Sequence, residues 1–319
     1  MNKNSLLFLI AVFIFVSCGS GAKKDPNKIS GNITISGAFA LYPLTVKWSE
    51  EFRKIYPDVR IDISAGGAGK GMADVLAGMV DIGMVSREVN PEEIKKGTWV
   101  IAVAKDAVIP VMNANNPLLA EIKEKGINKN EFRRIFIKNE LNDWNVLLGK
   151  SSGFKMNIYT RSDACGAAEV WANFLGVSQE NLNGIGVFGD PGIADAVKKD
   201  KYAIAYNNVN YAFDIHTRKL YEGIEAIPID FNNNGRIDST ENFYHHLDSF
   251  NLAVKTGRYA SPPARNLYFV FKGKPDNLLF ISFLNWVLSD GQKFVLESGY
   301  VGLSAEELKA ETSKILVNE

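Results

Sequence analysis

The sequence is poor in the residues on which most zinc and thiol chemistry depends. It has two cysteines and three histidines among 319 residues. His216, His245 and His246 show no spacing typical of a zinc site or a catalytic triad. The cysteines stand at 18 and 165, and if Cys18 is modified then Cys165 has no partner. We therefore expect neither a zinc enzyme nor a structural disulfide.

Net charge and long apolar runs are also missing. The chain carries 36 basic and 36 acidic side chains, for a formal net charge of +0, which argues against nucleic acid as a partner. Hydrophobic residues make up 46% and charged residues 23%, values typical of a folded globular chain. The apolar run from Leu6 to Val16 is too short to span a bilayer, which needs roughly 20 residues.

The N-terminal residues follow the order of an export signal. Lys3 precedes the apolar run, and Ser17-Cys18-Gly19 follows it. This order resembles the lipobox of bacterial lipoproteins, with Phe15 where leucine is usual. The resemblance implies a signal peptide over residues 1–17 and an acylated Cys18 that anchors the chain to a membrane outside the cytoplasm, in the periplasm or cell envelope. Residues 18–28 are polar and read as a tether. Ordinary signal cleavage beside an incidental cysteine is the alternative.

Short apolar runs alternate with helical patterns along the rest of the chain. The runs predict strands over 32–35, 60–63, 81–85, 158–159 and 202–206. The helical patterns predict helices over about 43–55, 69–77 and 164–175. This alternation predicts an α/β fold with largely parallel sheets.

Three segments each place a loop of small residues between a strand and a helix. We call residues 36–40 the first loop, 66–71 the second loop and 161–167 the third loop. Small residues let a ligand approach the backbone, and the free N–H groups at a helix N-terminus favour an anion. One such loop is weak support, because glycine-rich turns also serve packing, but three loops predict an anion site.

The same loops lie within longer motifs that resemble, in order, those of the phosphate-binding proteins of ABC transporters. The matching segments are residues 37–49 (GAFALYPLTVKWS), 64–72 (SAGGAGKGM), 79–88 (MVDIGMVSRE), 132–145 (FRRIFIKNELNDWN), 161–172 (RSDACGAAEVWA), 261–272 (SPPARNLYFVFK) and 283–304 (FLNWVLSDGQKFVLESGYVGLS). The resemblance covers residues 30 to 305.

This resemblance implies a fold and a function. The family fold is a two-lobed type II periplasmic-binding-protein clamshell, each lobe being a mixed, mostly parallel sheet flanked by helices. We expect residues 29–110 plus 265–319 to form one lobe and 111–264 the other. The chain would capture phosphate between the lobes, without catalysis, for delivery to an ABC permease. The alternative is a surface lipoprotein of the same fold that binds another oxyanion or acts as a sensor or scaffold.

The resemblance also implies a set of ligand-binding positions. They are Ala38, Phe39, Ala40, Ala68, Gly69, Asp81, Arg161, Cys165, Gly166 and Ala167. Arg161 would give the oxyanion a charge-assisted bond, unless it only pairs with Asp163. Asp81 only accepts hydrogen bonds, so it would favour phosphate, which keeps a proton, over sulfate. The alternative for Asp81 is a cap at the end of a strand.

Most hydroxyl groups that the family uses are absent here. Alanine, phenylalanine or cysteine stands at those positions, namely Ala38, Phe39, Ala40, Ala68, Cys165 and Ala167. Backbone N–H groups of Phe39, Ala40, Gly69, Gly166 and Ala167 remain as donors. Three interpretations stay open: weaker phosphate binding, a different ligand, or replacement hydroxyls from Ser36, Ser64 or Ser162. Cys165 also has an enzymatic interpretation, as a nucleophile at a helix N-terminus, but no histidine motif accompanies it.

A separate motif lies in residues 230–241 (DFNNNGRIDSTE), which fit the twelve-residue calcium-loop pattern D-x-[DN]-x-[DN]-G-x5-E. Its oxygen ligands would be Asp230, Asn232, Asn234, the Arg236 carbonyl, Asp238 and Glu241. Residues 226–229 read as a strand and not as a helix, so we expect one structural Ca²⁺ site and no paired sensor. The alternative is an Asn-Gly turn in a polar hairpin.

Overall fold

The computed structural model describes residues 29–316. Cys18, the predicted signal peptide and the whole predicted tether (residues 18–28) lie outside the described residues. Within 29–316, no helix combines the length and the apolar character needed to cross a bilayer.

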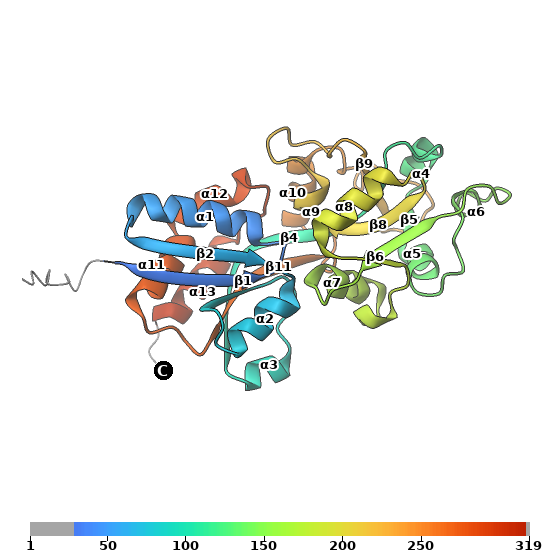
Figure 1. The fold of residues 1–319 in the computed structure, drawn as a ribbon. Helices are drawn as coiled ribbons and strands as arrows, with labels where there is room; N and C mark the ends of the chain where they lie inside the picture. Colours follow the sequence, from blue (N-terminus) through green and yellow to red (C-terminus); the bar gives the residue numbers. More distant parts are fainter. Residues whose placement is uncertain (1–28, 317–319) are drawn as a thin grey trace, which may run out of the picture.

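Lobe 1 is built around three parallel strands and an antiparallel neighbour (Figure 1). The strands are β1 (Gly31–Gly37), β2 (Val59–Ala65), β3 (Ile82–Val85) and β11 (Ala264–Lys272). The helices are α1 (Tyr42–Ile55), α2 (Ala68–Leu76), α3 (Pro91–Lys95), α11 (Leu278–Val287), α12 (Lys293–Glu297) and α13 (Ala305–Leu316), with a 3-10 turn at Asp290–Gln292. Trp48, Phe52 and Phe283 are fully buried in the core of this lobe.

Lobe 2 contains the middle of the chain and has its own core around Phe132, Trp171 and Tyr206. Its strands are β5 (Ile127–Asn128), β6 (Asn157–Arg161), β7 (Ile185–Val187), β8 (Ala203–Asn208), β9 (Ile224–Ala226) and β10 (Ile229–Asp230). Its helices are α4 (Leu119–Lys125), α5 (Lys129–Phe136), α6 (Trp144–Leu147), α7 (Gly166–Leu175), α8 (Gly189–Lys199), α9 (Val209–Ala212) and α10 (Leu247–Lys255), with a 3-10 turn at Gln179–Asn181.

One long strand, β4 (Thr98–Asn113), runs through both lobes. Its first part pairs with β11 and its second part with β8, so the strand order β2-β1-β3-β11-β4-β8-β6-β7 is continuous. Buried side chains up to Ala104 belong to the core of lobe 1, and those from Ala107 belong to the core of lobe 2. Along β4, the side chains therefore pass from the core of lobe 1 to the core of lobe 2 a few residues before the lobe boundary that we expected at 110. Along β11, the same change of core lies between Ala264 and Leu267.

The predicted α/β fold class is confirmed, and the register of lobe 1 explains where its loops open. β1 pairs in parallel with β2 and β3, with Gly37 opposite Ala65 and Met84. The carboxyl ends of these strands therefore lie at one edge of the sheet, which is where α/β proteins bind ligands. The first and second loops leave the sheet at this edge.

Candidate anion-binding cleft

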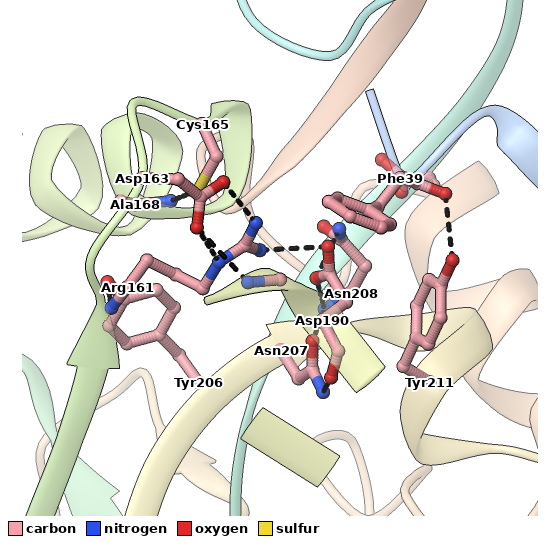
Figure 2. A network of polar contacts seen from close by, with 12 residues as sticks. Phe39, Arg161, Asp163, Cys165, Ala168, Asp190, Tyr206, Asn207, Asn208 and Tyr211 are labelled. Atoms are coloured by element: carbon pink, nitrogen blue, oxygen red, sulfur yellow. Dashed lines mark hydrogen bonds and ion pairs between the residues drawn. The ribbon is translucent and has the colours of Figure 1, made fainter. Parts of the chain in front are cut away.

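The three small-residue loops meet where lobe 1 faces lobe 2. The Gly69 N–H donates to the Ala164 carbonyl at 3.2 Å, which joins the second loop to the third. The Phe39 ring centre lies 5.7 Å from the Arg161 guanidinium carbon, which joins the first loop to the third. The Tyr211 hydroxyl donates to the Phe39 carbonyl at 3.2 Å (Figure 2). The structure therefore brings together loops that the sequence identified separately.

Two glycines of these loops, Gly37 and Gly71, are needed for close packing within lobe 1. A Cβ atom on Gly37, whose φ is 134°, would lie 2.3 Å from the Met84 carbonyl oxygen. A Cβ atom on Gly71 would lie 2.8 Å from the Gly37 Cα. Helix α2 thus sits directly on the ends of β1 and β3, which holds its N-terminus at the cleft. Side chains at these two positions would push that helix away.

Helix α7 directs its N-terminus at the cleft. The Cys165 thiol caps this helix, because its Sγ accepts the Ala168 N–H at 3.4 Å. The N–H groups of Gly166 and Ala167 belong to the first turn, where a helix provides no acceptors of its own. They are therefore available as donors, and their use by a ligand stays a prediction. The Gly69 N–H is different, since it already donates to Ala164.

The Cys165 thiol has the wrong ionisation state for a nucleophile. It is 5% exposed, and burial raises its pKa to about 12 although Arg161 opposes the shift. At neutral pH the side chain is therefore a thiol and not a thiolate, and the thiolate is the reactive form. The structure assigns Cys165 a capping role and does not support the hydrolase interpretation.

Arg161 lies at the centre of a buried ionic network (Figure 2). Its Nε and Nη2 donate to the Asp163 carboxylate at 2.8 and 2.6 Å, and its Nη1 donates to Asp190 Oδ2 at 2.8 Å. The local pair with Asp163, which the sequence left as an alternative, is therefore present. Asp190 is a second partner that sequence reasoning missed. Asp190 follows Arg161 by 29 residues and lies outside the three loops, so no local pattern pointed to it.

The network continues from the cleft to the strands that join the lobes. Asn208 Nδ2 donates to Asp190 Oδ1 at 2.6 Å, and Arg265 Nη2 donates to Asn208 Oδ1. Arg265 Nε donates to Asp106 Oδ1 at 2.7 Å, which links β11 to β4 where the core changes lobe. Burial raises the pKa of Asp190 and of Asp106, and the arginines oppose this. Three carboxylates accompany two guanidiniums, so the network has no excess positive charge.

Asp81 lies away from this network, which corrects our expectation that it contacts the anion. Its Oδ2 accepts both the N–H and the hydroxyl of Thr34, each at 2.7 Å. It directly precedes β3, whereas the cleft lies at the carboxyl end of that strand. Asp81 is therefore the strand-end cap that the sequence left as an alternative. Held by Thr34, Asp81 does not select phosphate over sulfate.

Ser86 is the cleft hydroxyl that sequence reasoning missed. It directly follows β3, is 2% exposed, and its Oγ would lie 2.3 Å from a Cβ atom on Gly166. Among the described residues, its hydroxyl has no hydrogen-bond partner. Of the serines proposed as substitutes, Ser36 donates to Asp74 at 2.7 Å, and Ser64 and Ser162 are exposed. Following β3 to its carboxyl end would have found Ser86.

An ion pair next to Ser86 also crosses between the lobes. Arg87 Nε lies 3.0 Å from Glu169 Oε2 on α7, and Arg87 Nη2 donates to Glu93 at 2.7 Å within lobe 1. Burial raises the pKa of Glu169, and Arg87 opposes this only in part. Glu93 also neutralises the charge of Arg87. The attraction of Arg87 therefore stabilises the Glu169 carboxylate by less free energy than the carboxylate loses when it leaves water.

The predicted calcium loop is bonded to other parts of lobe 2 and to none of the three cleft loops. β10 pairs with β5, and the Ile237 N–H donates to the Glu124 carbonyl at 2.8 Å. The six predicted ligand residues thus form a feature separate from the cleft.

Comparisons of the sequence with known proteins find relatives in one family of binding proteins. A family model described as a PBP superfamily domain matches residues 22–291. The phosphate-binding protein PstS of Bacillus subtilis is 30% identical over 226 residues, covering 67% of this chain and 72% of that protein. PstS of Methanocaldococcus jannaschii is 24% identical and covers 95% of this chain and 92% of that protein.

Solved structures show the same fold. A Clostridium perfringens substrate-binding protein, assigned to a phosphate ABC transporter and solved with bound phosphate, aligns with a TM-score of 0.70. It is 22% identical, over 86% of this chain and all of that one. A phosphate transport receptor from Vibrio cholerae aligns with a TM-score of 0.61 at 17% identity, with the same coverage. At these identities the likeness concerns the two-lobed fold, which confirms the predicted clamshell.

Proposed function

Because the chain belongs to the PBP superfamily and, within it, to the phosphate-binding proteins, we propose that it captures phosphate between its lobes for an ABC importer. The observation that carries the proposal is the meeting of three loops and two helix N-termini around Arg161 at the lobe interface. Oriented N–H groups at helix N-termini are suited to an oxyanion. The chain would be a binding protein and not an enzyme.

Phosphate would be held mainly by hydrogen bonds from backbone N–H and hydroxyl groups, and less by attraction to a net positive charge. The N–H groups of Ala68, Gly166 and Ala167 and the Ser86 hydroxyl supply hydrogen bonds at the cleft. Arg161 adds no net positive charge at the cleft, because its three nitrogens already donate to the Asp163 and Asp190 carboxylates. Hydrogen bonds to charged groups contribute about 1.5–3 kcal/mol each, so a few oriented donors suffice for binding.

A carboxylate beside the cleft gives this site a preference for phosphate over sulfate. Asp163 Oδ2 would lie 3.0 Å from a Cβ atom on Gly67, so it borders the second loop. A carboxylate accepts a hydrogen bond from an anion that carries a proton and repels one that does not. Phosphate keeps a proton at neutral pH and sulfate has none. In this proposal Asp163 takes the role that the sequence assigned to Asp81.

Aromatic and polar contacts across the interface hold the lobes together over the ligand. The Phe39 ring of lobe 1 lies edge-on to Phe188 of lobe 2, with centroids 6.0 Å apart. The Tyr211 bond to Phe39 and the Arg87–Glu169 pair also cross the interface. Hinge closure about β4 and β11 would make and break these contacts as phosphate enters and leaves.

The proposal includes an extracytoplasmic location and a lipid anchor at Cys18. The support is the order of charged, apolar and small residues that ends at Cys18, followed by the polar residues 19–28. The anchored chain would hold its lobes close to the permease that receives phosphate. An exported protein without a lipid would instead be released from membranes.

Uptake of labelled phosphate by cells tests the function. Cells without the gene should take up less phosphate at low concentration, and the intact gene should restore uptake. Ser86→Ala should raise the phosphate concentration needed for half-maximal uptake, whereas Ser162→Ala, an exposed serine in the third loop, should not. Equal uptake with and without the gene would contradict the proposal. Uptake of another oxyanion in its place would support the alternative ligand that the missing hydroxyls suggest.

A further inference from the structure

The loop after β10 carries oxygen-bearing side chains at the spacing of a calcium loop. The residues at positions 1, 3, 5, 9 and 12 of the twelve are Asp230, Asn232, Asn234, Asp238 and Glu241. Gly235 stands at position 6, where calcium loops need a sharp turn, and position 7, Arg236, contributes its carbonyl. Nothing in phosphate capture by the cleft uses this pattern.

The folded loop brings its first and last acidic side chains to the same place. Gly235 has φ 81°, and the Asp230 carboxylate accepts the Gly235 N–H at 2.9 Å, so the chain winds around Asp230. Glu241 Oε1 accepts the Phe231 N–H at 2.9 Å, so Glu241 lies against the start of the loop. These contacts arrange the side chains, but they do not by themselves indicate an ion.

The burial of two carboxylates without a counter-charge is what indicates an ion. Asp230 is 2% exposed and Glu241 is 5% exposed. Within residues 29–316, neither has a lysine, arginine or histidine at ion-pair distance, and their hydrogen bonds come from neutral N–H groups. The buried Asp190 differs, since it has Arg161 as a partner. Buried charges are otherwise paired or bound to metal, so this pair lacks a cation.

The chemistry of the remaining ligands selects calcium. No group of three or more His, Cys, Asp or Glu side chains in the described part of the chain is placed to hold a metal ion. The pattern at residues 230–241 combines carboxylates with amide and backbone oxygens, which zinc disfavours and Ca²⁺ accepts. Asn232, Asn234 and the Arg236 carbonyl supply these oxygens. We propose that residues 230–241 bind one Ca²⁺ ion, independently of the cleft.

The ion would stabilise the end of lobe 2 that carries the loop. Phe231 follows the first ligand and packs edge-on against Tyr259 at 5.7 Å and Phe174 at 6.5 Å. Phe243 and Tyr244 follow the last ligand and stack on each other at 4.6 Å. Calcium would hold both ends of the loop, and with them these aromatic rings. Because the strand β10 precedes the loop, the site has no helix pair to open, and its role is structural.

Direct binding to the purified protein is the first test. After treatment with EGTA, titration with CaCl₂ followed by calorimetry should show one ion per chain, with a Kd on the order of 10⁻³ M or below, as in extracellular calcium modules. Calcium should raise Tm, and magnesium should do so less, because it demands a smaller octahedral site. A protein that binds no calcium at several millimolar and has the same Tm in EGTA overturns the proposal.

Variants identify the residues that hold the ion. Glu241→Gln keeps the shape of the side chain and removes one charge, so it should abolish the calcium-induced rise in Tm. Asp238→Asn, in a partly exposed side chain, should weaken calcium binding and provides the test if Glu241→Gln does not fold. Glu222→Gln changes an exposed carboxylate outside the loop and should behave as the unmutated protein. Calcium binding that is unchanged in Asp238→Asn or in a folded Glu241→Gln overturns this assignment. Phosphate binding by these variants is a separate measurement, so failure here leaves the proposed function untouched.

Discussion

Ser86→Ala separates binding from folding in the cleft. The Ser86 side chain is buried beside Gly166 at the N-terminus of α7, and its hydroxyl has no hydrogen-bond partner within the described residues. In the proposed phosphate complex this hydroxyl would donate to the anion, and such a bond contributes about 1.5–3 kcal/mol. Its removal should therefore weaken phosphate binding by roughly 10- to 150-fold.

The same change should not lower stability in the absence of phosphate. Deleting a buried hydroxyl that has no intramolecular partner removes no native hydrogen bond, so Tm should stay the same or rise. Calorimetric titration with phosphate and a melting curve of the unliganded protein give the two quantities. Ser162→Ala is the matched control and should change neither. Unchanged phosphate affinity in Ser86→Ala would show that the hydroxyl does not reach the anion, and a clear fall in Tm would show a structural role instead.

Three further predictions concern single side chains outside the anion contacts. The pKa of about 12 for Cys165 predicts very slow alkylation by iodoacetamide at pH 8 in the folded protein and fast alkylation in denaturant, and fast reaction of the folded form would contradict its burial. Burial raises the pKa of Glu169, so the folded chain holds this proton more tightly, and stability is lost as pH rises through the raised pKa. Glu169→Gln should remove that part of the dependence of Tm on pH, and an unaltered curve would refute the assignment. Cys18→Ala should release the protein from the membrane fraction, and continued membrane association would place the anchor elsewhere.

The local elements of the cleft were accessible from the sequence because they depend on neighbours in the chain. Alternating apolar runs predicted β1, β2 and β3 within a few residues, and small residues marked each loop before a helix. The buried strand β3 was visible in the same way, but a pattern of apolar residues does not say which flanking side chain faces the ligand. We assigned the role to Asp81 at one end, and the parallel register places Ser86 at the cleft end.

The ionic network was not accessible, because it joins residues that are distant in the sequence. Arg161 meets Asp190 through the packing of α8 against β6 and β8, and Arg265 meets Asp106 through the pairing of β11 with β4. Each contact requires the tertiary arrangement. The sequence also placed the lobe boundary at 110, because it could not show that one strand of 16 residues crosses both cores.

The central claim is that the cleft around Arg161 binds phosphate, and titration calorimetry of the purified protein with phosphate tests it most directly. Phosphate should bind with one ion per chain, and sulfate at the same concentration should bind more weakly because it offers no proton to Asp163. Arsenate and molybdate complete the comparison. Absence of heat with phosphate, together with saturable binding of sulfate or molybdate, would contradict the account.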